Sequence, residues 1–98
     1  MSSSAIELKV TLATTVVVTD DTLTVDLSDG RTISVPLASY PRLAHATSEE
    51  RSVWRLIGRG EGIHWPQLDE DISVEGLIVG KASGESQRSL AKWLRERE

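Results

Sequence analysis

His64 and the acidic run Asp69 to Asp71 are the residues of this chain whose types and spacing could carry out chemistry. A histidine with nearby carboxylates can bind a divalent metal or exchange a proton as a general acid and base. A metal site needs several convergent ligands, yet Trp65 and Pro66 separate His64 from the acids, and His45 is the one other histidine. We therefore expect a structural histidine hydrogen-bonded to the backbone, with no metal and no cofactor.

Two other patterns that could support catalysis are incomplete. The glycines Gly58, Gly60 and Gly62 resemble a phosphate-binding loop, but no strand is expected before them and no Gly-Lys-Ser/Thr ending follows. The serines occupy a tail, turns and helix caps, and none stands in a Gly-x-Ser-x-Gly elbow. The glycines are interpreted as a helix stop and a tight loop, and the chain as a binding protein that is not an enzyme.

Length and composition set the size of the fold that must position these residues. The chain has 98 residues, of which 39% are hydrophobic, so we expect one domain with a modest core. There is no cysteine, which excludes a disulfide framework, thiolate catalysis and a cysteine-ligated metal site. A domain of this size without disulfides is marginally stable alone, which favours a homo-oligomer.

The charge balance limits the kinds of partner. The formal net charge is −4, which argues against direct binding of nucleic acid through phosphate neutralisation. The sequence shows no basic leader, and no apolar run approaches the roughly 20 residues needed to cross a bilayer. We therefore expect a cytoplasmic protein with no membrane contact.

The first third of the chain has the pattern of strands. Leu23, Val25 and Leu27 alternate with polar residues, as expected of a strand with one buried face. Asp29-Gly30 supplies the tight turn of a hairpin, because this pair tolerates positive φ. The sequence predicts a hairpin of 22–27 with 32–35, preceded by one or two strands around 7–18.

Two helices are expected after the sheet. Thr47-Ser48-Glu49-Glu50 has the spacing of a capping box and predicts a central helix that ends at Gly58. Its inner stripe would be Val53, Trp54, Leu56 and Ile57. Near the C-terminus, apolar residues at positions i, i+3 and i+4 predict an amphipathic helix of about three turns; they are Leu90, Trp93 and Leu94.

These elements predict an α+β fold. A small antiparallel sheet of three to four N-terminal strands would be packed by the central helix, over residues 1–82. Residues 83–98 would form the C-terminal helical extension. The segment 72–80 fits a short helix or a strand, and the acids Asp69 to Asp71 before it suit a helix-capping role.

The three tryptophans have different expected roles. Trp54 shares the inner face of its predicted helix and is assigned to the core. For Trp65, burial against the sheet is favoured over an exposed anchor. Trp93 either docks on its own domain or contacts a second chain, and the sequence leaves both open.

Several segments together resemble a bacterial domain of unknown function, family 2442 (DUF2442), over about residues 12–80. The most specific part runs from the Trp-Pro pair into Asp-Ile-Ser. The segments that carry the resemblance are Asp29-Gly30-Arg31, Val35-Pro36-Leu37, Tyr40-Pro41-Arg42-Leu43, Ala46-Thr47 with Glu50-Arg51, Trp54, Gly62-Ile63-His64-Trp65-Pro66 and Leu68 to Leu77.

The resemblance implies a small α+β domain with an antiparallel sheet and supplies no catalytic residues. Some relatives continue into a helix-turn-helix domain, and others are encoded beside a second small protein, as in toxin-antitoxin pairs. Fewer than 20 residues follow the family region in this sequence, and a helix-turn-helix domain does not fit in them.

We therefore expect a protein-binding or regulatory module, such as the antitoxin-like half of a two-gene pair, whose partner is a small basic protein. An acidic patch beside an aromatic anchor suits such a partner by charge complementarity. The alternatives are a dimeric DNA-associated regulator and a metal-assisted enzyme. The expected partner-binding residues are Trp65, Asp69, Glu70, Asp71, Leu90, Trp93 and Leu94.

Overall fold

The computed structural model describes residues 11–97. Its strands are β1 (Ala13–Val18), β2 (Thr22–Leu27), β3 (Thr32–Pro36), β4 (Arg55–Ile57), β5 (Gly62–Trp65) and β6 (Glu70–Ser73). Its helices are the 3-10 helix η1 (Leu37–Ser39), α2 (Pro41–Ala44), α3 (Ser48–Ser52), α4 (Val74–Ile78) and α5 (Gln87–Glu96). None of these helices has the length and apolar content that crossing a bilayer requires.

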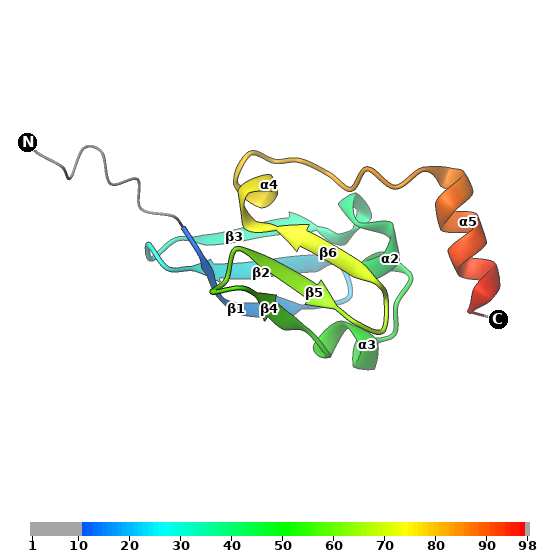
Figure 1. Cartoon of the computed structure of the whole chain (residues 1–98), viewed down its shortest axis with the longest axis horizontal. Coiled ribbons are helices and arrows are strands. Elements are labelled where there is room, and N and C mark those ends of the chain that lie inside the picture. The colour runs from blue at the N-terminus through cyan, green and yellow to red at the C-terminus, as the bar shows by residue number, and fades with distance from the viewer. Residues whose placement is uncertain (1–10, 98) are drawn as a thin grey trace, which may run out of the picture.

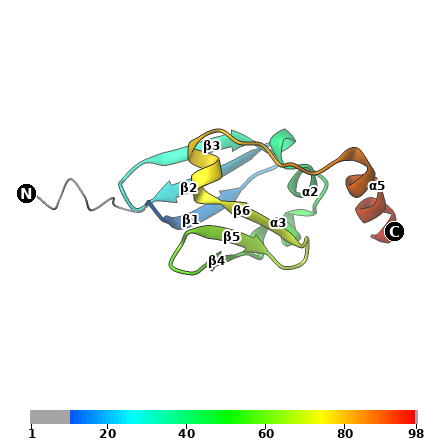
Figure 2. The same ribbon diagram turned by 45° about the horizontal axis from the view of Figure 1, so that its top comes forward.

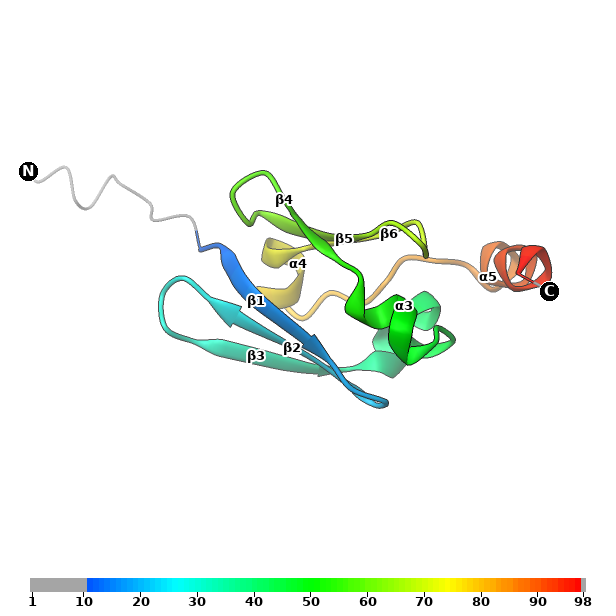
Figure 3. The same cartoon turned by 90° about the horizontal axis from the view of Figure 1, so that it is seen from below.

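The strands form two three-stranded antiparallel sheets, β1-β2-β3 and β4-β5-β6. Seen from below, the two sheets form separate layers, with α3 beside one end of them (Figure 3). The α+β class and the antiparallel pairing are thus confirmed. The prediction of one N-terminal sheet packed by a central helix is wrong, because the second half of the domain supplies another sheet.

The N-terminal sheet follows the sequence pattern closely. β2 pairs with β3 in the register Leu23↔Val35 and Val25↔Ile33, and the predicted Asp29-Gly30 pair lies in the turn between them. Gly30 has a φ of 93°, the left-handed conformation for which this turn needs glycine. The hairpin prediction is confirmed, and β1 is the predicted preceding strand; the rest of the range 7–18 lies partly outside the described residues.

The predicted central helix begins correctly and then stops after one turn. The Thr47 hydroxyl accepts a hydrogen bond from Glu50 N–H at 3.1 Å, and the Glu50 carboxylate accepts one from Thr47 N–H at 2.9 Å, so the capping box is present. Helix α3 nevertheless ends at Ser52. We attribute this to the residues that follow, because Arg55, Leu56 and Ile57 pair with β5 as strand β4 and the β-branched Val53 and aromatic Trp54 before them favour an extended chain.

Burial within the apolar run 53–57 alternates from one residue to the next, which is the pattern of a strand and explains β4. Trp54 and Leu56 are half-buried against the core, whereas Val53 and Ile57 are 38% and 37% exposed. A helical stripe would bury all four of these residues. The same residues therefore satisfy the period of a half-buried strand, and the assignment of Trp54 to the core holds only in part.

The glycine loop between β4 and β5 links the two sheets. Gly60 has a φ of 120°, and its carbonyl accepts a hydrogen bond from Ala13 N–H at 2.8 Å. A Cβ added at Gly60 would lie 2.5 Å from the Ala13 carbonyl oxygen. Gly58 and Gly60 therefore form the tight turn that the sequence predicts, and Gly62 begins β5. The predicted helix stop is wrong, because strand β4 and not a helix precedes Gly58.

Replacing Gly60 by alanine is expected to destabilise the protein by about 1 to 3 kcal/mol, from backbone strain alone, with the Ala13 clash adding to it. Urea unfolding followed by circular dichroism measures this change. Gly84→Ala is the matched control, because a Cβ there meets no atom within 4 Å. Equal stability of the two variants would contradict the structural role of Gly60.

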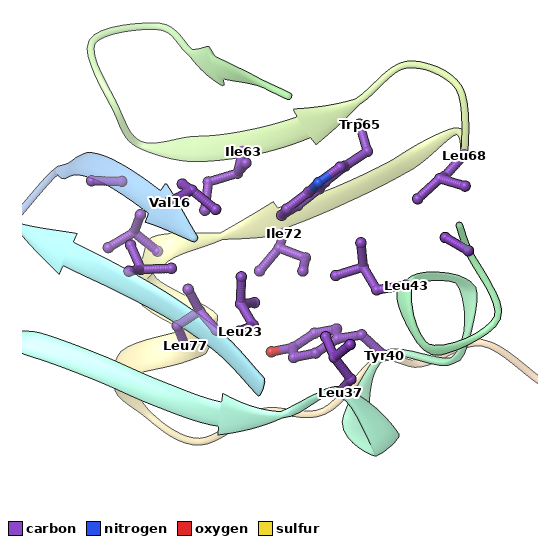
Figure 4. Packing of buried hydrophobic residues seen from close by; sticks show 14 of the residues in the cluster. Val16, Leu23, Leu37, Tyr40, Leu43, Ile63, Trp65, Leu68, Ile72 and Leu77 are labelled. Atoms are coloured by element: carbon purple, nitrogen blue, oxygen red, sulfur yellow. The ribbon is translucent and has the colours of Figure 1, made fainter. Parts of the chain in front are cut away.

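The core lies between the two sheets, and α2 contributes Leu43 to it at one end. Figure 4 shows Leu23 from β2, Ile63 and Trp65 from β5 and Leu43 from α2 directed into the same space. Leu23, Leu43, Ile63 and Trp65 have no exposed surface. Each buried aliphatic or aromatic side chain of this kind contributes roughly 1.5 to 3 kcal/mol of transfer free energy.

Arg51 is a buried cation that holds α2 and α3 together. Its guanidinium donates to the carbonyl oxygens of Leu43 at 2.9 Å and Ala44 at 3.0 Å, and approaches the Asp20 carboxylate at 3.4 Å. The indole N–H of Trp65 donates to the Arg51 carbonyl at 3.1 Å. The Arg51 guanidinium thus supplies a donor to the Ala44 carbonyl at the end of α2 and a further donor to the Leu43 carbonyl, which also accepts from Ala46 N–H at 3.2 Å.

Helix α5 is confirmed as the amphipathic C-terminal helix, and it docks on its own domain. Trp93 is only 9% exposed, and the guanidinium carbons of Arg42 and Arg97 lie 5.2 and 4.4 Å from its ring centroid. Arg97 also forms an ion pair of 2.7 Å with Glu50. The sequence left two roles open for Trp93, and the structure shows the intramolecular one.

The Glu50 ion pair makes the stability of the protein dependent on pH. The hydrogen bonds from Arg97, followed by that from the Thr47 N–H, lower the pKa of Glu50 from its ordinary value of 4.5 to about 2. A depressed carboxylate pKa stabilises the fold above the unfolded-state value, so this contribution is lost as pH falls from about 4.5 through about 2.

Glu50→Gln is therefore expected to cost about 1 kcal/mol at pH 7, as an ion pair of good geometry does. The difference from the unmodified protein should shrink as pH falls from about 4.5 and vanish only below about 2, where Glu50 in the folded protein is itself protonated. Urea unfolding of both proteins at a series of pH values measures it. A difference that persists unchanged at low pH would show that the side chain acts through something other than its charge.

Candidate functional site: an acidic groove beside β6

A groove of about 370 Å³ runs along the edge of β6 that faces away from β5. Its other wall is the segment 81–86, which has no regular structure and connects α4 to α5; we call it the strap. Figures 1 and 2 show the strap passing on the side of β6 opposite to β5. The groove is lined by Tyr40, Arg42, residues 69–73, Gly76, residues 81–85 and Ser89.

Arg42 joins the walls at one end of the groove. It donates to both carboxylate oxygens of Glu85, at distances from 2.7 to 2.9 Å, and to the carbonyl oxygens of Leu68 and Asp69 at 3.1 and 3.2 Å. The Arg42 and Glu85 side chains are only 16% and 8% exposed. This buried pair therefore fixes the strap and the start of α5 against the β5–β6 turn.

Tyr40 and Ser39 hold the first half of the strap in place. The Tyr40 hydroxyl donates to the Lys81 carbonyl at 3.0 Å, and the backbone amide of Ser83 donates to the Ser39 carbonyl at 2.9 Å. Burial, and then the negative charge of Glu70, raise the pKa of Tyr40. The groove thus has a defined far wall, held by side-chain and backbone hydrogen bonds.

The groove has an excess of negative charge. Its lining includes four acidic residues, Asp69, Glu70, Asp71 and Glu85, and two basic ones, Arg42 and Lys81. Glu85 already neutralises Arg42. Burial raises the pKa of Glu70, and the charge of Glu85 raises it further, while Arg42 opposes the shift. A cation placed beside Glu70 would favour its ionised form, so the groove is suited to positively charged ligands.

His64 pairs with Asp71 on the outer face of the second sheet. The two residues lie opposite each other in the β5–β6 register, and His64 Nδ1 contacts the Asp71 carboxylate. They form a non-hydrogen-bonded pair of the ladder, the kind in which side chains come closest. The expected backbone partner of His64 is therefore replaced by a carboxylate from the neighbouring strand.

The predicted metal site and the predicted helix-capping role of the acids can also be compared with the structure. Within residues 11–97, no group of three or more histidine, cysteine or acidic side chains is arranged to hold a metal ion. The geometry thus lends no support to a metal-assisted enzyme centred on His64, Asp69 and Asp71. The capping role expected for the acids is wrong, because Ser73 caps α4 by accepting from Gly76 N–H at 2.9 Å.

The structure separates the predicted partner-binding residues into two groups. Asp69, Glu70 and Asp71 lie together in the groove, and the side chains of Asp69 and Asp71 are 92% and 67% exposed. Trp65 is wholly buried, so it offers no surface to a partner. The α5 residues face their own domain; Trp93 is buried there, and Leu90 and Leu94 are half-buried.

Sequence reasoning did not assign Tyr40, Arg42, Lys81 and Glu85 to the site. The Arg42–Glu85 pair spans 43 positions, so no local spacing indicates it. The sequence signal that was available is Tyr40-Pro41-Arg42, one of the segments that carries the family resemblance.

Comparison with known proteins gives a family and a fold. The family model described as "Protein of unknown function (DUF2442)" matches residues 13–83, which include every groove residue except Gly84, Glu85 and Ser89. No curated protein matches the chain.

Two solved structures are similar to this chain. A crystal structure of a protein of unknown function from Rhodospirillum rubrum has 26% sequence identity and a TM-score of 0.68, covering 81% of this chain and 98% of that one. A solution structure of an uncharacterized protein from Chromobacterium violaceum has 22% identity and a TM-score of 0.64, covering 88% of this chain and 75% of that one; it bears on the fold alone. The family match spans most of the described residues, and the chain therefore belongs to the DUF2442 family of proteins of unknown function.

Proposed function

We propose that this protein is a small protein-binding module, and that the groove beside β6 receives a positively charged segment of its partner. The observation that supports the proposal most directly is the groove itself, whose lining includes four acidic residues and two basic ones. Charge complementarity of this kind steers a partner to its site and excludes partners of the wrong sign.

The groove is preformed, which favours binding of a ligand. The Arg42–Glu85 and Tyr40–Lys81 hydrogen bonds hold the strap in place, so a ligand does not need to order it. Among the described residues, the groove has no cluster arranged to hold a metal ion. Its exposed lining combines the carboxylates of Asp69 and Asp71 with Lys81 and serine hydroxyls. A fixed acidic surface is what recognition of a basic segment needs.

The partner that we propose is a small basic protein, such as the nuclease-like member of a two-gene toxin-antitoxin pair. Such an enzyme binds phosphates with a basic face, and an acidic groove can occupy that face in place of the nucleic acid. The chain's net charge of −4 is consistent with this antitoxin-like role.

Affinity capture from the native host, followed by mass spectrometry, tests the proposal. The protein should retain a small basic protein in stoichiometric amount, which is released as salt is raised. Asp71→Lys should lose this protein, whereas Glu49→Lys, an exposed change of equal charge outside the groove, should keep it. Equal capture by both variants, or capture of the chain by itself alone, would contradict the proposal.

A further inference from the structure

The edge of β6 that borders the groove carries unpaired backbone groups. Val74 N–H donates to the Glu61 carbonyl at 2.9 Å, which identifies residues 61 and 74 as a hydrogen-bonded pair extending the β5–β6 ladder. Hydrogen-bonded and non-hydrogen-bonded pairs alternate in an antiparallel ladder, so Ile72 bonds to β5 whereas Asp71 and Ser73 direct their N–H groups away from it.

Within residues 11–97, the Asp71 carbonyl and the outward Ser73 N–H have no hydrogen-bond partner in the strap or elsewhere. The outward Asp71 N–H bonds only to the adjacent side chain, the Glu70 carboxylate, and pairs with no other strand. The carbonyl of Ser73 is different, because Ser73 is the N-cap of α4 and its carbonyl begins the helix. An exposed strand edge of this kind is a template for another strand.

The groove follows this edge along its whole length. Its lining includes Asp69 and every residue of β6, a distance of about 13 Å at the usual rise per residue. The strap forms the opposite wall without regular structure, so the space beside β6 is bounded on two sides.

We propose that the partner segment binds in an extended conformation and adds a strand to the free edge of β6. This inference rests on the proposed function and specifies how the groove is used. The segment would exchange hydrogen bonds with Asp71 N–H and C=O and accept one from Ser73 N–H. Main-chain bonds supply the affinity in this mode of recognition, and alternate side chains supply the specificity.

The acids select a basic segment over a second copy of this chain. Side chains on one face of the added strand would lie near Glu70, and those on the other face near Asp71, since these two residues face opposite sides of β6. Lysine or arginine on either face would therefore meet a carboxylate. Pairing of β6 with the β6 of a second copy would place like charges against each other, which is unfavourable.

Two synthetic octapeptides of alternating lysine and threonine test this mode of binding. One has an ordinary backbone, and the other is N-methylated at every residue, so it keeps the charge but has no amide N–H. The ordinary peptide should bind at least about 10-fold more tightly, since the methylated one cannot donate to the Asp71 carbonyl and its methyl groups block approach to the edge. Amide exchange at Asp71 and Ser73 should slow only with the ordinary peptide.

Asp71→Pro and Asp71→Ala form the matched pair on the protein side. Both remove the carboxylate, but only proline also removes the N–H, and proline is tolerated where an edge N–H faces outward. Asp71→Pro should bind the ordinary peptide at least about 5-fold more weakly than Asp71→Ala. If this variant does not fold, the peptide comparison decides the question alone.

The outcomes separate the two proposals. Equal binding of both peptides in the groove, without slowed exchange at Asp71 and Ser73, would overturn strand addition and leave the acidic groove as a charge-recognition site. Binding of neither peptide would also overturn strand addition, while the capture experiment decides separately on the proposed function.

Discussion

Replacing Trp65 by alanine is expected to lower the free energy of unfolding by about 3 to 5 kcal/mol, the largest stability effect that we predict for a single substitution. Trp65 has no exposed surface, and its indole N–H donates to the Arg51 carbonyl at 3.1 Å. The substitution would therefore leave a cavity between the sheets and a buried carbonyl without its donor. A domain of this size has only about 5 to 15 kcal/mol of stability, so much of it would be lost.

Urea unfolding at neutral pH measures the effect, and Trp54→Ala is the matched control. Trp54 is half-buried against the same core, so its replacement should cost clearly less. A loss below about 1 kcal/mol for Trp65→Ala would fall outside the range for buried aromatic residues. It would contradict the burial of Trp65 between the sheets.

The second large effect is expected on binding. Asp69→Asn combined with Asp71→Lys should weaken binding of the lysine–threonine octapeptide on the order of 10- to 100-fold, or roughly 1.4 to 2.8 kcal/mol. Both side chains are largely exposed, so the fold should tolerate the changes. Asparagine is chosen at position 69 because Asp69 has a φ of 52°, a conformation that asparagine accepts.

Isothermal titration at low salt measures this loss. The control is Asp29→Asn combined with Glu49→Lys, which changes the net charge equally outside the groove. Asparagine before Gly30 also suits the hairpin turn. If the control weakens binding as strongly as the groove variant does, overall charge and not the groove controls affinity.

The parts of the fold that were predictable from sequence depend on neighbouring residues. The β2–β3 hairpin follows from alternation and an Asp-Gly turn, and the start of α3 follows from its capping box. The Gly58 to Gly62 loop is also local. In each case the side chains that decide the structure lie within a few positions of one another, so their spacing is sufficient.

The central helix was predicted wrongly because its apolar run fits two periods. Val53 to Ile57 satisfies a helical stripe, yet only pairing with β5 shows that Trp54 and Leu56 alone face the core. Short apolar runs cannot be assigned from periodicity when the choice depends on a strand later in the chain.

Only one wall of the groove, the one that carries the acids 69–71, was predictable from the sequence. The acids of residues 69–71 were evident as a charged run, but the wall opposite them depends on contacts between distant residues. Arg42 reaches Glu85 and Tyr40 reaches Lys81 across more than 40 positions. The burial of Trp93 likewise depends on Arg42, which no local pattern places beside it, whereas Arg97 follows at the i+4 position.

The most direct test of the account is a titration of the isotope-labelled protein with the lysine–threonine octapeptide, followed by amide chemical shifts. We predict that the shifts change along both walls of the groove, at residues 69–73 and 81–85, while the outer face of β1 to β3 is unaffected. Changes confined to α5 or scattered over the surface, or no changes at millimolar peptide, would contradict the claim that this groove recognises a basic segment.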